Sequence, residues 1–426
     1  MTHTTRSITL PYGSDTRTIS IPAANLSWLV GPHAAPAVGD LPTAIRNALR
    51  SPIGSPALPE LVAHHGKNTV ILVDDNTRTT PQPQILPVLL DELNAAGVPD
   101  SSITGLIALG THRPMSASEC LEHYGEETLA RICVENLSPD ADDFVDLGTT
   151  PQGIPIHVSR RYLESDISIA VGSIIPHMYA GWSGGAKMVQ PGVTDHLTTA
   201  MTHLIAGPRV YDILGQPENS ARSEMEEVAV RSGLKFILNV VLSSAREVSA
   251  AVAGDVIAAH RAGVDIARKI YTVTVPSRPD IVIATSHPAD RDLWQGVKAL
   301  NNCGMLVRDG GTLILLHPAP EGIAHDHPAL TSLGITPAED VLQMVERGEI
   351  HDGVAAATYL ALDQTRKRAR VVLVSIGIIP EDAAQIGLEA TTDHQAAIQA
   401  ALARHGSDAS IGVVTAGAEI FGQIVP

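Results

Sequence analysis

Aromatic side chains and cysteines are scarce in this sequence. Phe, Trp and Tyr supply only 3% of the 426 residues although 44% are hydrophobic, so a core must be built from Ala, Val, Ile and Leu. The three cysteines, Cys120, Cys133 and Cys303, are too few and too widely spaced for a disulfide framework or a cysteine-rich zinc site. We expect reduced and mostly buried thiols.

Basic residues and long apolar runs are also in short supply. The chain has 29 Lys and Arg against 46 Asp and Glu, with a short basic cluster at Arg366-Lys367-Arg368. Nucleic acids bind clustered basic residues, so we expect no nucleic-acid partner. No apolar run reaches the roughly 18 residues that a membrane helix needs, and the first residues lack the apolar stretch of a signal peptide. We expect a cytoplasmic protein without a membrane segment.

Strand-like and helix-like segments alternate along most of the chain. After a predicted hairpin, buried strand runs are followed by polar loops and then by helices. The predicted hairpin is Ser7–Leu10 with Arg17–Ile21, the strands are Thr69–Val73, Ile103–Leu109, Ile167–Val171, Asp280–Ala284, Thr312–Leu316 and Val371–Ser375, and the helices include Leu41–Leu49, Leu58–His65, Gln82–Ala96, Pro337–Glu346 and Gln395–Arg404. Ser116 and Glu119 make a capping box for a further helix. This alternation predicts an α/β fold with largely parallel sheets.

Two α/β domains follow from the chain length and from a proline-rich stretch. At roughly 150 residues per domain, 426 residues suggest two or three domains, and Pro276-Ser277-Arg278-Pro279 is the predicted hinge. We expect an N-terminal domain of residues 1–272 and a C-terminal domain of residues 276–407. Residues 408–426 are assigned to the N-terminal domain, because the strand-like run Ala409–Thr415 is expected to rejoin it. The active-site cleft is expected between the domains.

Loops that follow strands are the first candidates for a site, because ligands of parallel sheets bind beyond the carboxyl ends of the strands. After the first strand, Arg78 could hold a carboxylate in its guanidinium fork while Asp75 holds the guanidinium. The equally weighted alternative is a solvated turn in which Asp75 or Thr79 caps the next helix. After the second strand, His112 follows a glycine and could approach a ligand, although a single histidine there is more often an ordinary loop residue.

The loop from Ile175 to Gly192 holds the densest set of features. Four glycines and two prolines surround His177 and Lys187. Ser183-Gly184-Gly185 could present backbone N–H groups to a phosphate, and Lys187 could have a lowered pKa and become a nucleophile. A Walker loop is excluded, because Lys187 lacks the preceding Gly and the following Ser or Thr. The alternative, a structural loop with a surface lysine, is disfavoured by this concentration of features.

Three further candidates lie downstream. His203 stands on the helix that leaves this loop, and His196 is seven residues away, too far for the usual i, i+4 metal chelate. A metal bound by His203 would therefore need ligands from elsewhere. In the second half, Gln295 and Lys298 face one way on a helix and could reach an anionic ligand across the cleft. An ordinary amphipathic helix is a close alternative.

Taken in order, these loops resemble the nickel-dependent lactate racemase family, the 2-hydroxyacid racemases and epimerases that use a nickel-pincer nucleotide. The resemblance covers nearly the whole chain, from Leu10-Pro11-Tyr12 into the second half. It rests on the order and spacing of several stretches: Asp75-Asn76-Thr77-Arg78, Gly110-Thr111-His112-Arg113-Pro114, His177, Ser183-Gly184-Gly185-Ala186-Lys187, Pro191-Gly192, His203, and Pro288-Ala289-Asp290 with Gln295 and Lys298.

The resemblance implies a cofactor and its protein ligands. The family's cofactor is the nickel complex of a pyridinium-3,5-bisthiocarboxylic acid mononucleotide, whose two sulfur-containing arms grip the metal. Lys187 is implied as its covalent anchor and His203 as the protein ligand to nickel. A single imidazole beside sulfur donors suits Ni(II). Proteins of cofactor biosynthesis are implied as maturation partners.

The implied reaction is inversion at C2 of a 2-hydroxycarboxylate by reversible hydride transfer. His112 and His177 match the two acid/base histidines of the family. Arg78 would hold the substrate carboxylate, Asp75 would orient Arg78, and Gln295 with Lys298 would complete the pocket. Closure of the second domain would exclude water.

Some residues depart from the family pattern and leave the substrate open. Trp294 stands where a smaller aromatic residue is expected in the substrate pocket, and an aromatic residue expected near Asp352-Gly353-Val354 is absent. The substrate is lactate-like, or larger, such as malate or an aldonate. Arg291 could pair with a second carboxylate or hydroxyl group, although a surface position is the preferred interpretation.

Two other classes of protein are alternatives to a 2-hydroxyacid racemase. A non-catalytic protein that binds the nickel cofactor is disfavoured by the intact pair of His112 and His177. A nicotinamide dehydrogenase lacks support, because no Gly-x-Gly-x-x-Gly follows a strand with an acidic residue about 20 positions on. The oligomeric state is left open.

Overall fold

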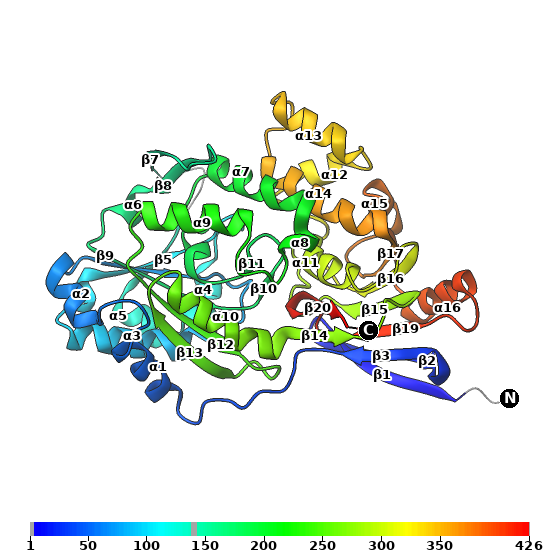
Figure 1. The fold of residues 1–426 in the computed structure, drawn as a ribbon, viewed down its shortest axis with the longest axis horizontal. Helices are drawn as coiled ribbons and strands as arrows, with labels where there is room; N and C mark the ends of the chain where they lie inside the picture. Colours follow the sequence, from blue (N-terminus) through cyan, green and yellow to red (C-terminus); the bar gives the residue numbers. More distant parts are fainter. Residues whose placement is uncertain (1–3, 138–142, 426) are drawn as a thin grey trace.

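Two six-stranded sheets form the frame of the molecule and lie side by side in Figure 1. The computed structural model describes residues 4–137 and 143–425, so positions 1–3, 138–142 and 426 of the predicted domains lie outside the described residues. The fold is α/β with two largely parallel sheets, as the alternation of strands and helices predicts. No helix in the described ranges is long and apolar enough to cross a membrane.

The first sheet contains the strands that carry most of the predicted site loops. Only β12 and β13 pair in antiparallel fashion in it; the other neighbours are parallel. Its order is β13 (Val248–Gly254), β12 (Phe236–Leu242), β9 (Ile167–Ser173), β4 (Thr69–Val73), β5 (Ile103–Ile107) and β6 (Cys133–Asn136). The chain runs outward from β4 to β5 and β6 and then returns to β9 on the other side of β4. Strands β4 and β9 therefore flank a switch point, where α/β sheets bind ligands.

Strand β4 shows why this sheet is buried on both faces. Its five residues, Thr-Val-Ile-Leu-Val, are all buried. Ile71 and Val73 pack into one hydrophobic cluster, and Val70 and Leu72 pack into another on the opposite face. The helices of this half are α1 (Leu41–Arg50), α2 (Leu58–His65), α3 (Gln82–Ala95), α4 (Ala117–Tyr124), α5 (Glu126–Arg131), α6 (Arg160–Leu163), α7 (His196–Ala206), α8 (Val210–Ile213), α9 (Ser220–Arg231) and α10 (Ala258–Tyr271).

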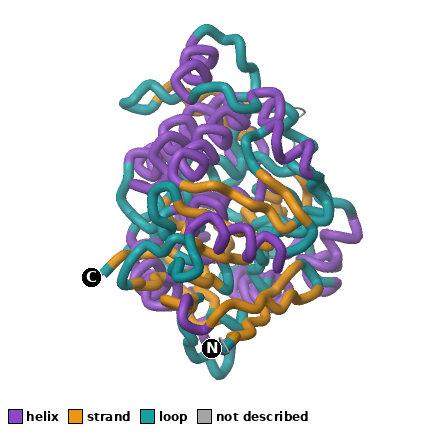
Figure 2. Tube along the Cα trace, turned by 90° about the vertical axis from the view of Figure 1, so that its right-hand side faces the viewer, coloured by secondary structure: helices purple, strands orange, loops and turns teal. Residues whose placement is uncertain are grey.

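The second sheet is parallel throughout. Its order is β18 (Glu389–Thr391), β17 (Ala369–Val374), β16 (Gly311–Leu316), β15 (Ile281–Thr285), β19 (Ile411–Val414) and β3 (Leu26–Val30). Figure 2 views this half end-on, with helices above the strands. Its helices are α11 (Leu293–Gly304), α12 (Ala329–Leu333), α13 (Ala338–Glu346), α14 (Gly353–Arg368), α15 (Pro380–Gln385) and α16 (His394–His405).

Short strand pairs complete the structure. The predicted N-terminal hairpin is confirmed as β1 (Thr5–Tyr12) and β2 (Asp15–Pro22), and it packs on the second sheet together with α16. The other pairs are β7 (Phe144–Thr149) with β8 (Pro155–Ser159), β10 (Pro176–His177) with β11 (Gly181–Trp182), and β14 (Thr272–Val275) with β20 (Phe421–Ile424).

The strand-like run Ala409–Thr415 forms β19, which does not join the first sheet, and the assignment of residues 408–426 to the N-terminal domain stays a prediction. Strand β19 lies inside the second sheet, where it pairs with β15 and with β3 from the N-terminal part of the chain. The contact is tight at Gly412, where an added Cβ would lie 2.2 Å from the Trp28 ring. A partner strand almost 400 residues away in the sequence leaves no local signal. The predicted domain boundaries near residue 276 stay a prediction.

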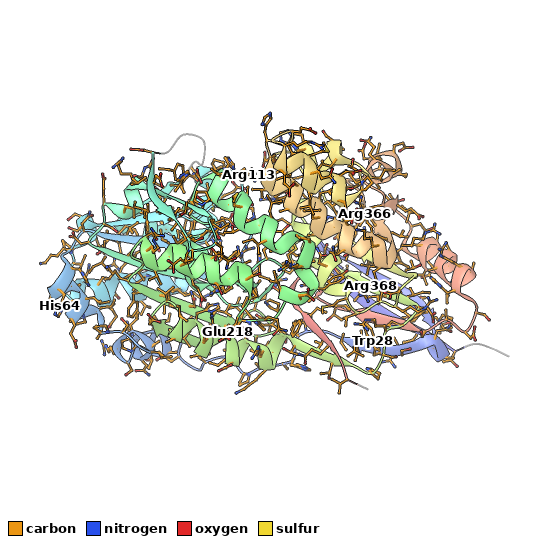
Figure 3. The ribbon with its side chains drawn as sticks, turned by 45° about the horizontal axis from the view of Figure 1, so that its top comes forward. Trp28, His64, Arg113, Glu218, Arg366 and Arg368 are labelled. Atoms are coloured by element: carbon orange, nitrogen blue, oxygen red, sulfur yellow. The ribbon has the colours of Figure 1, made fainter. Side chains whose placement is uncertain are left out.

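The side chains of the basic cluster at the end of α14 make contacts within the protein. Arg366 and Lys367 contact the Asp363 carboxylate, and Arg366 also donates to the carbonyls of Gly334 and Ile386. Arg368 contacts Asp309 and lies over the Tyr211 ring. Figure 3 shows Arg366 and Arg368 along this helix. Because these charges are paired within the protein, they do not form a patch for a polyanion.

The predicted capping box at Ser116 is present. Ser116 Oγ accepts from the Glu119 N–H at 3.3 Å, and the Glu119 carboxylate accepts from the Ser116 N–H at 2.8 Å. We expect Ser116→Ala to lower the free energy of unfolding by about 1 kcal/mol, because the first turn of α4 loses its side-chain acceptor. Urea denaturation checks this, with the exposed Ser244→Ala as the control. Equal stability of both variants would contradict it.

Candidate active site

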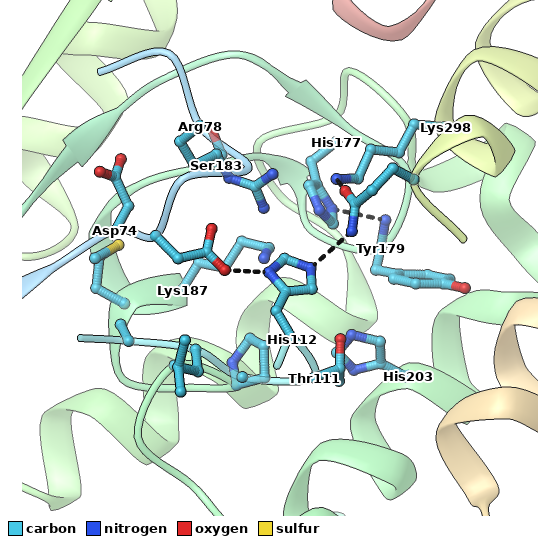
Figure 4. Close-up of a pocket in the computed structure, with 18 of the residues that line it drawn as sticks. Asp74, Arg78, Thr111, His112, His177, Tyr179, Ser183, Lys187, His203 and Lys298 are labelled. Atoms are coloured by element: carbon cyan, nitrogen blue, oxygen red, sulfur yellow. Dashed lines mark hydrogen bonds and ion pairs between the residues drawn. The ribbon is translucent and has the colours of Figure 1, made fainter. Parts of the chain in front are cut away.

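Eleven of the twelve predicted site residues line one cavity between the two halves of the molecule. The space within the cavity and its opening to solvent is about 800 Å³. Its walls include the predicted residues Asp75, Arg78, His112, His177, Ser183, Gly184, Lys187, His203, Trp294, Gln295 and Lys298. Gly185 is not among the lining residues. Figure 4 shows the nitrogen-rich side chains of this set directed into a common space.

The sheet topology explains this convergence. The loops after β4, β5 and β9 leave from the same edge of the first sheet, since these strands are parallel neighbours. They bring Arg78, His112 and His177 to the switch point between β4 and β9. The start of α11 contributes Gln295 and Lys298 from the second half, where Asp292 caps the helix by accepting from the Gln295 N–H at 2.8 Å.

A chain of hydrogen bonds crosses the cavity from one half to the other. The Asp75 carboxylate accepts from His112 Nδ1 at 2.5 Å, and the Gln295 side-chain amide donates to His112 Nε2 at 3.1 Å. The amide is oriented this way because Gln295 Oε1 accepts from the Lys298 amino group. His112 therefore carries its proton on Nδ1 and presents the lone pair of Nε2 to the cavity.

The pair of Asp75 and His112 consists of an anion and a neutral ring. Burial raises the pKa of Asp75, but His112, Arg78 and Thr77 together lower it far below its usual range. Burial lowers the pKa of His112, and the nearby cations Lys298 and Arg78 lower it further against the opposing effect of Asp75. A neutral imidazole with an oriented lone pair is a general base.

His177 has the opposite arrangement of its proton. Its Nδ1 accepts from the Tyr179 N–H at 3.2 Å, so the proton of the neutral ring is on Nε2. The ring is buried, which holds its pKa well below the usual value, and Lys187 and Arg78 lower it further. The cavity therefore has one histidine whose Nε2 is an acceptor, bound by the Gln295 amide, and one whose Nε2 carries an N–H.

Asp75 contacts different groups from those that the sequence predicts. Its Oδ1 accepts from the Thr77 hydroxyl at 2.6 Å and its Oδ2 binds His112, so it orients His112 directly. Arg78 instead donates to Thr77 Oγ1 at 3.4 Å, and within the described ranges it has no ion pair with Asp75. The guanidinium of Arg78 thus faces the cavity as a cation available to an anionic ligand. Asp74 is occupied with Thr80 and Gln82 in holding the loop.

Buried side chains from neighbouring elements hold the loop Ile175–Gly192, which carries Lys187. Arg222 of α9, fully buried, donates to the carbonyls of Trp182 and Gly184, and it is neutralised by Glu226 at 2.9 Å. His260 of α10 binds the Ser183 carbonyl at 2.9 Å, and Asn239 of β12 accepts from the Gly185 N–H at 2.9 Å. Movement of this loop would leave two buried guanidinium N–H groups of Arg222 without their carbonyl acceptors.

Backbone N–H groups that the sequence predicts to bind a phosphate are hydrogen-bonded within the protein instead. The Ser183 N–H donates to Ile175 and the Gly185 N–H to Asn239, while the Ser183 hydroxyl bridges Ser173 and Ile175. The glycines are needed for close approach instead, because a Cβ on Gly184 would lie 2.8 Å from Asn239 Oδ1 at a φ of 74°. Phosphate binding by Ser183, Gly184 and Gly185 stays a prediction.

Lys187 is a buried amine whose pKa is lowered. It lies in a 3-10 turn, η3 (Gly185–Met188), and among the described residues its Nζ has no hydrogen-bond or ion-pair partner. Burial lowers its pKa well below 10.5, and the cations Arg78 and Arg222 add to this against Asp75. A neutral amine that faces a cavity is a nucleophile.

His203 has the geometry of a metal ligand. Its Nδ1 donates to the Thr199 carbonyl at 2.9 Å, which leaves the lone pair of Nε2 free of protein partners in the described chain. Burial, with Lys187, lowers its pKa to about 3, so the ring is neutral. The described residues contain no group of three or more His, Cys, Asp or Glu that could hold a metal. A metal at His203 would therefore take its other ligands from a bound molecule.

Several residues of the site were not predicted from the sequence. Arg222, Asn239 and His260 lie in segments that read as ordinary elements of an α/β sheet. His327 stacks on Trp294 with ring centroids 3.9 Å apart. Glycines such as Gly184, where a Cβ would not fit, are the signal in the sequence that other side chains pack closely against this loop. They do not reveal which side chains these are.

Arg291 does not reach the cavity. It contacts Asp292 at 3.3 Å and Glu321 at 3.4 Å, and it is not among the residues that line the cavity in the described chain. The structure thus agrees with the preferred interpretation of a surface residue. Trp294, Val354 and Thr358 form the wall on this side instead.

The fold and cavity define a class of site: an α/β cleft between two halves, lined by two neutral histidines, a buried lysine, a further buried imidazole and a guanidinium with no ion pair in the described part of the chain. Comparison with known proteins gives the family. Residues 12–209 match the lactate racemase N-terminal domain. The chain is 33% identical over 325 residues to a lactate racemase of Lactiplantibacillus plantarum and 30% identical over 324 residues to one of Thermoanaerobacterium thermosaccharolyticum, in each case 74% of this chain and 75% of the relative. The chain belongs to the lactate racemase family.

Solved structures agree with this assignment. The lactate racemase apoprotein of Thermoanaerobacterium thermosaccharolyticum superposes with a TM-score of 0.85 at 25% identity, over 98% of this chain and 100% of that one. A crystal structure of a protein from Thermotoga maritima has a TM-score of 0.67 at 19% identity, over 86% of this chain and 96% of that one. The second match shows a shared fold alone.

The state of Lys187 can be measured without any ligand. Because burial lowers its pKa, we expect acetylation of Lys187 by a small anhydride to reach half its maximal rate at a pH well below 10.5. Peptide mass spectrometry over a pH series gives this profile, with the exposed Lys67 in the same protein as the internal reference. Coincident profiles for the two lysines would contradict the assignment.

Proposed function

We propose that the protein is a nickel-dependent racemase or epimerase that inverts C2 of a 2-hydroxycarboxylate. The observation that carries this proposal is the pair of neutral histidines at one cavity, with a lone pair on His112 and an N–H on His177. Inversion needs a base that removes the hydroxyl proton of one enantiomer. It also needs an acid that returns a proton to the same oxygen after the planar keto acid has turned its other face to the hydride donor. Family membership supports the same reaction class.

The residues of the cavity fit the cofactor that the family resemblance implies. Lys187 is a neutral amine without a protein partner, as a covalent anchor requires, and His203 offers Nε2 to a metal while Thr199 fixes its ring. No further protein ligands surround His203 in the described ranges, which suits a nucleotide whose own sulfur donors hold nickel. The bound nickel-pincer nucleotide would supply a centre that accepts the C2 hydrogen as hydride and returns it.

The protein's own part is to bind the substrate and to move its hydroxyl proton. Arg78 can hold the carboxylate in its guanidinium fork, and the buried Lys298 amine, whose pKa burial lowers, offers further N–H donors from the other side of the cleft. His112, held by Asp75, removes the hydroxyl proton as the C2 hydrogen departs, which leaves a planar 2-keto acid. After the keto acid presents its other face, the oxygen regains a proton from a histidine that carries two: the imidazolium formed at His112, or His177 once it has taken up a second proton. For the opposite enantiomer the two rings exchange roles.

A screen of chiral 2-hydroxyacids tests the proposal. We expect holoprotein, produced with nickel and the cofactor-assembly enzymes, to convert one enantiomer or epimer of lactate, malate or an aldonate into the other, measured by chiral chromatography. His112→Asn and His177→Asn are each expected to lower kcat by about 10²- to 10⁴-fold, because a proton-transfer group is lost. The exposed His64→Gln is the matched control. Nickel-loaded protein that inverts no member of the panel would overturn the proposal in favour of cofactor binding without turnover.

The carboxylate beside His112 gives a second test. In Asp75→Asn an amide replaces the anion that accepts from Nδ1, so the ring can take the other tautomer and lose its lone pair at Nε2. We expect kcat to fall on the order of 10²- to 10⁴-fold with a smaller change in KM. Steady-state kinetics decide this, and a variant with the kcat of the wild type would show that Asp75 does not set the state of His112.

A further inference from the structure

His327 joins the two halves of the molecule beside the cavity. It lies in the loop before α12, in the second half, and its Nδ1 is 2.8 Å from Asp352 Oδ2. Its Nε2 is 3.1 Å from the carbonyl oxygen of Thr111, which belongs to the loop after β5 in the first half. Its ring also stacks on Trp294, with an interplanar angle of 12°. The side chain is 7% exposed, so water does not replace these partners.

Both hydrogen-bond partners of His327 are acceptors. A carbonyl oxygen has no proton to donate, and the Asp352 carboxylate already accepts from the Ala355 N–H at 2.9 Å as the cap of α14. A neutral imidazole has one N–H and can satisfy only one of the two. The ring therefore needs both protons, and a planar cation stacked on an indole gains a cation–π interaction.

The surrounding charges favour this cation. Burial lowers the pKa of His327, but Asp352, the Thr111 carbonyl and Asp326 together raise it above 6.5. Burial raises the pKa of Asp352, and His327 with His196 of α7 lowers it below its ordinary value, so the carboxylate is charged. From the first half, Arg113 is paired with Glu119 at 2.7 Å.

Two of the residues that His327 contacts, Thr111 and Trp294, are next in sequence to residues of the proposed site. Thr111 precedes His112, and Trp294 precedes Gln295, whose amide donates to His112. Thr111 and Trp294 also line the cavity. Anything that fixes both of them fixes the base and one wall of the pocket at the same time.

We propose that His327, as an imidazolium, is a positioning residue that closes the second half over the cavity by tying Asp352 and Trp294 to the loop that carries His112. The inference rests on the proposed function only where it concerns turnover; the charge and contacts of the ring stand apart from it. A raised pKa means that the closed arrangement is favoured below pH 6.5 and is lost as the pH rises through the pKa of the folded protein. Deprotonation removes one of the two N–H donors, and the bond to Thr111 or to Asp352 breaks.

Three variants separate this role from a merely structural one. Asp352→Asn keeps an oxygen to cap α14 but removes the anion beside the ring. His327→Gln removes the charge and the stack. His325→Gln is the matched control, because His325 is 92% exposed two residues away.

The first measurement is the titration of the His327 ring by NMR in protein without cofactor. We expect a pKa above 6.5 in the wild type and a lower one in Asp352→Asn. We also expect faster hydrogen exchange of the segment 109–113 in His327→Gln than in His325→Gln, because the segment loses its anchor in the second half. This part needs no activity and decides the contact even if the proposed function fails.

The second measurement is KM against pH in the holoprotein, with a 2-hydroxyacid that it turns over. We expect KM to rise about 10-fold in the wild type as the ring loses its proton, the ratio that corresponds to one charged hydrogen bond, and to be high and flat in His327→Gln. A purely structural role would leave the shape of the profile unchanged. The proposal is overturned by a His327 ring that titrates at or below 6.5, or by the same KM profile in His327→Gln and His325→Gln.

Discussion

The hydrogen bond between His112 and Gln295 is the contact on which the site depends. It is made only when the two halves meet, and it requires the ring to keep its proton on Nδ1 against Asp75. Water would weaken both bonds, so the state of His112 depends on closure of the cleft. The proposed chemistry depends on this contact across the cavity, and Lys298 orients the Gln295 amide that makes it.

A second constraint is the fixed position of the loop that carries Lys187, and it involves residues of the first half alone. Buried Arg222, His260 and Asn239 fix the loop that carries Lys187, and the same crowding of cations keeps that lysine neutral. The molecule thus separates two tasks. The first half holds Lys187 and His203, the proposed anchor and metal ligand, whereas the second half contributes Gln295 and Lys298, the proposed substrate-facing groups.

The sequence reaches far into this site, because parallel strands end at a common edge. Hydrophobic runs locate β4, β5 and β9, and the loops behind them contain Arg78, His112, His177 and Lys187, which the structure brings to one cavity. What the sequence could not supply is long-range pairing. The place of β19 beside β3, the contact of Asp75 with His112 and the burial of Arg222 each depend on a partner distant in the chain. His327 reads as an isolated surface histidine until the two halves are together.

Isotope retention tests the central claim most directly. A 2-hydroxyacid labelled with deuterium at C2 is inverted by holoprotein in ordinary water, and the product is examined by mass spectrometry. Because the histidines handle only the hydroxyl proton, the account predicts that deuterium stays at C2 of the inverted product. Exchange of that deuterium with solvent during inversion would mean that a histidine removes the C2 hydrogen as a proton, and it would contradict the account.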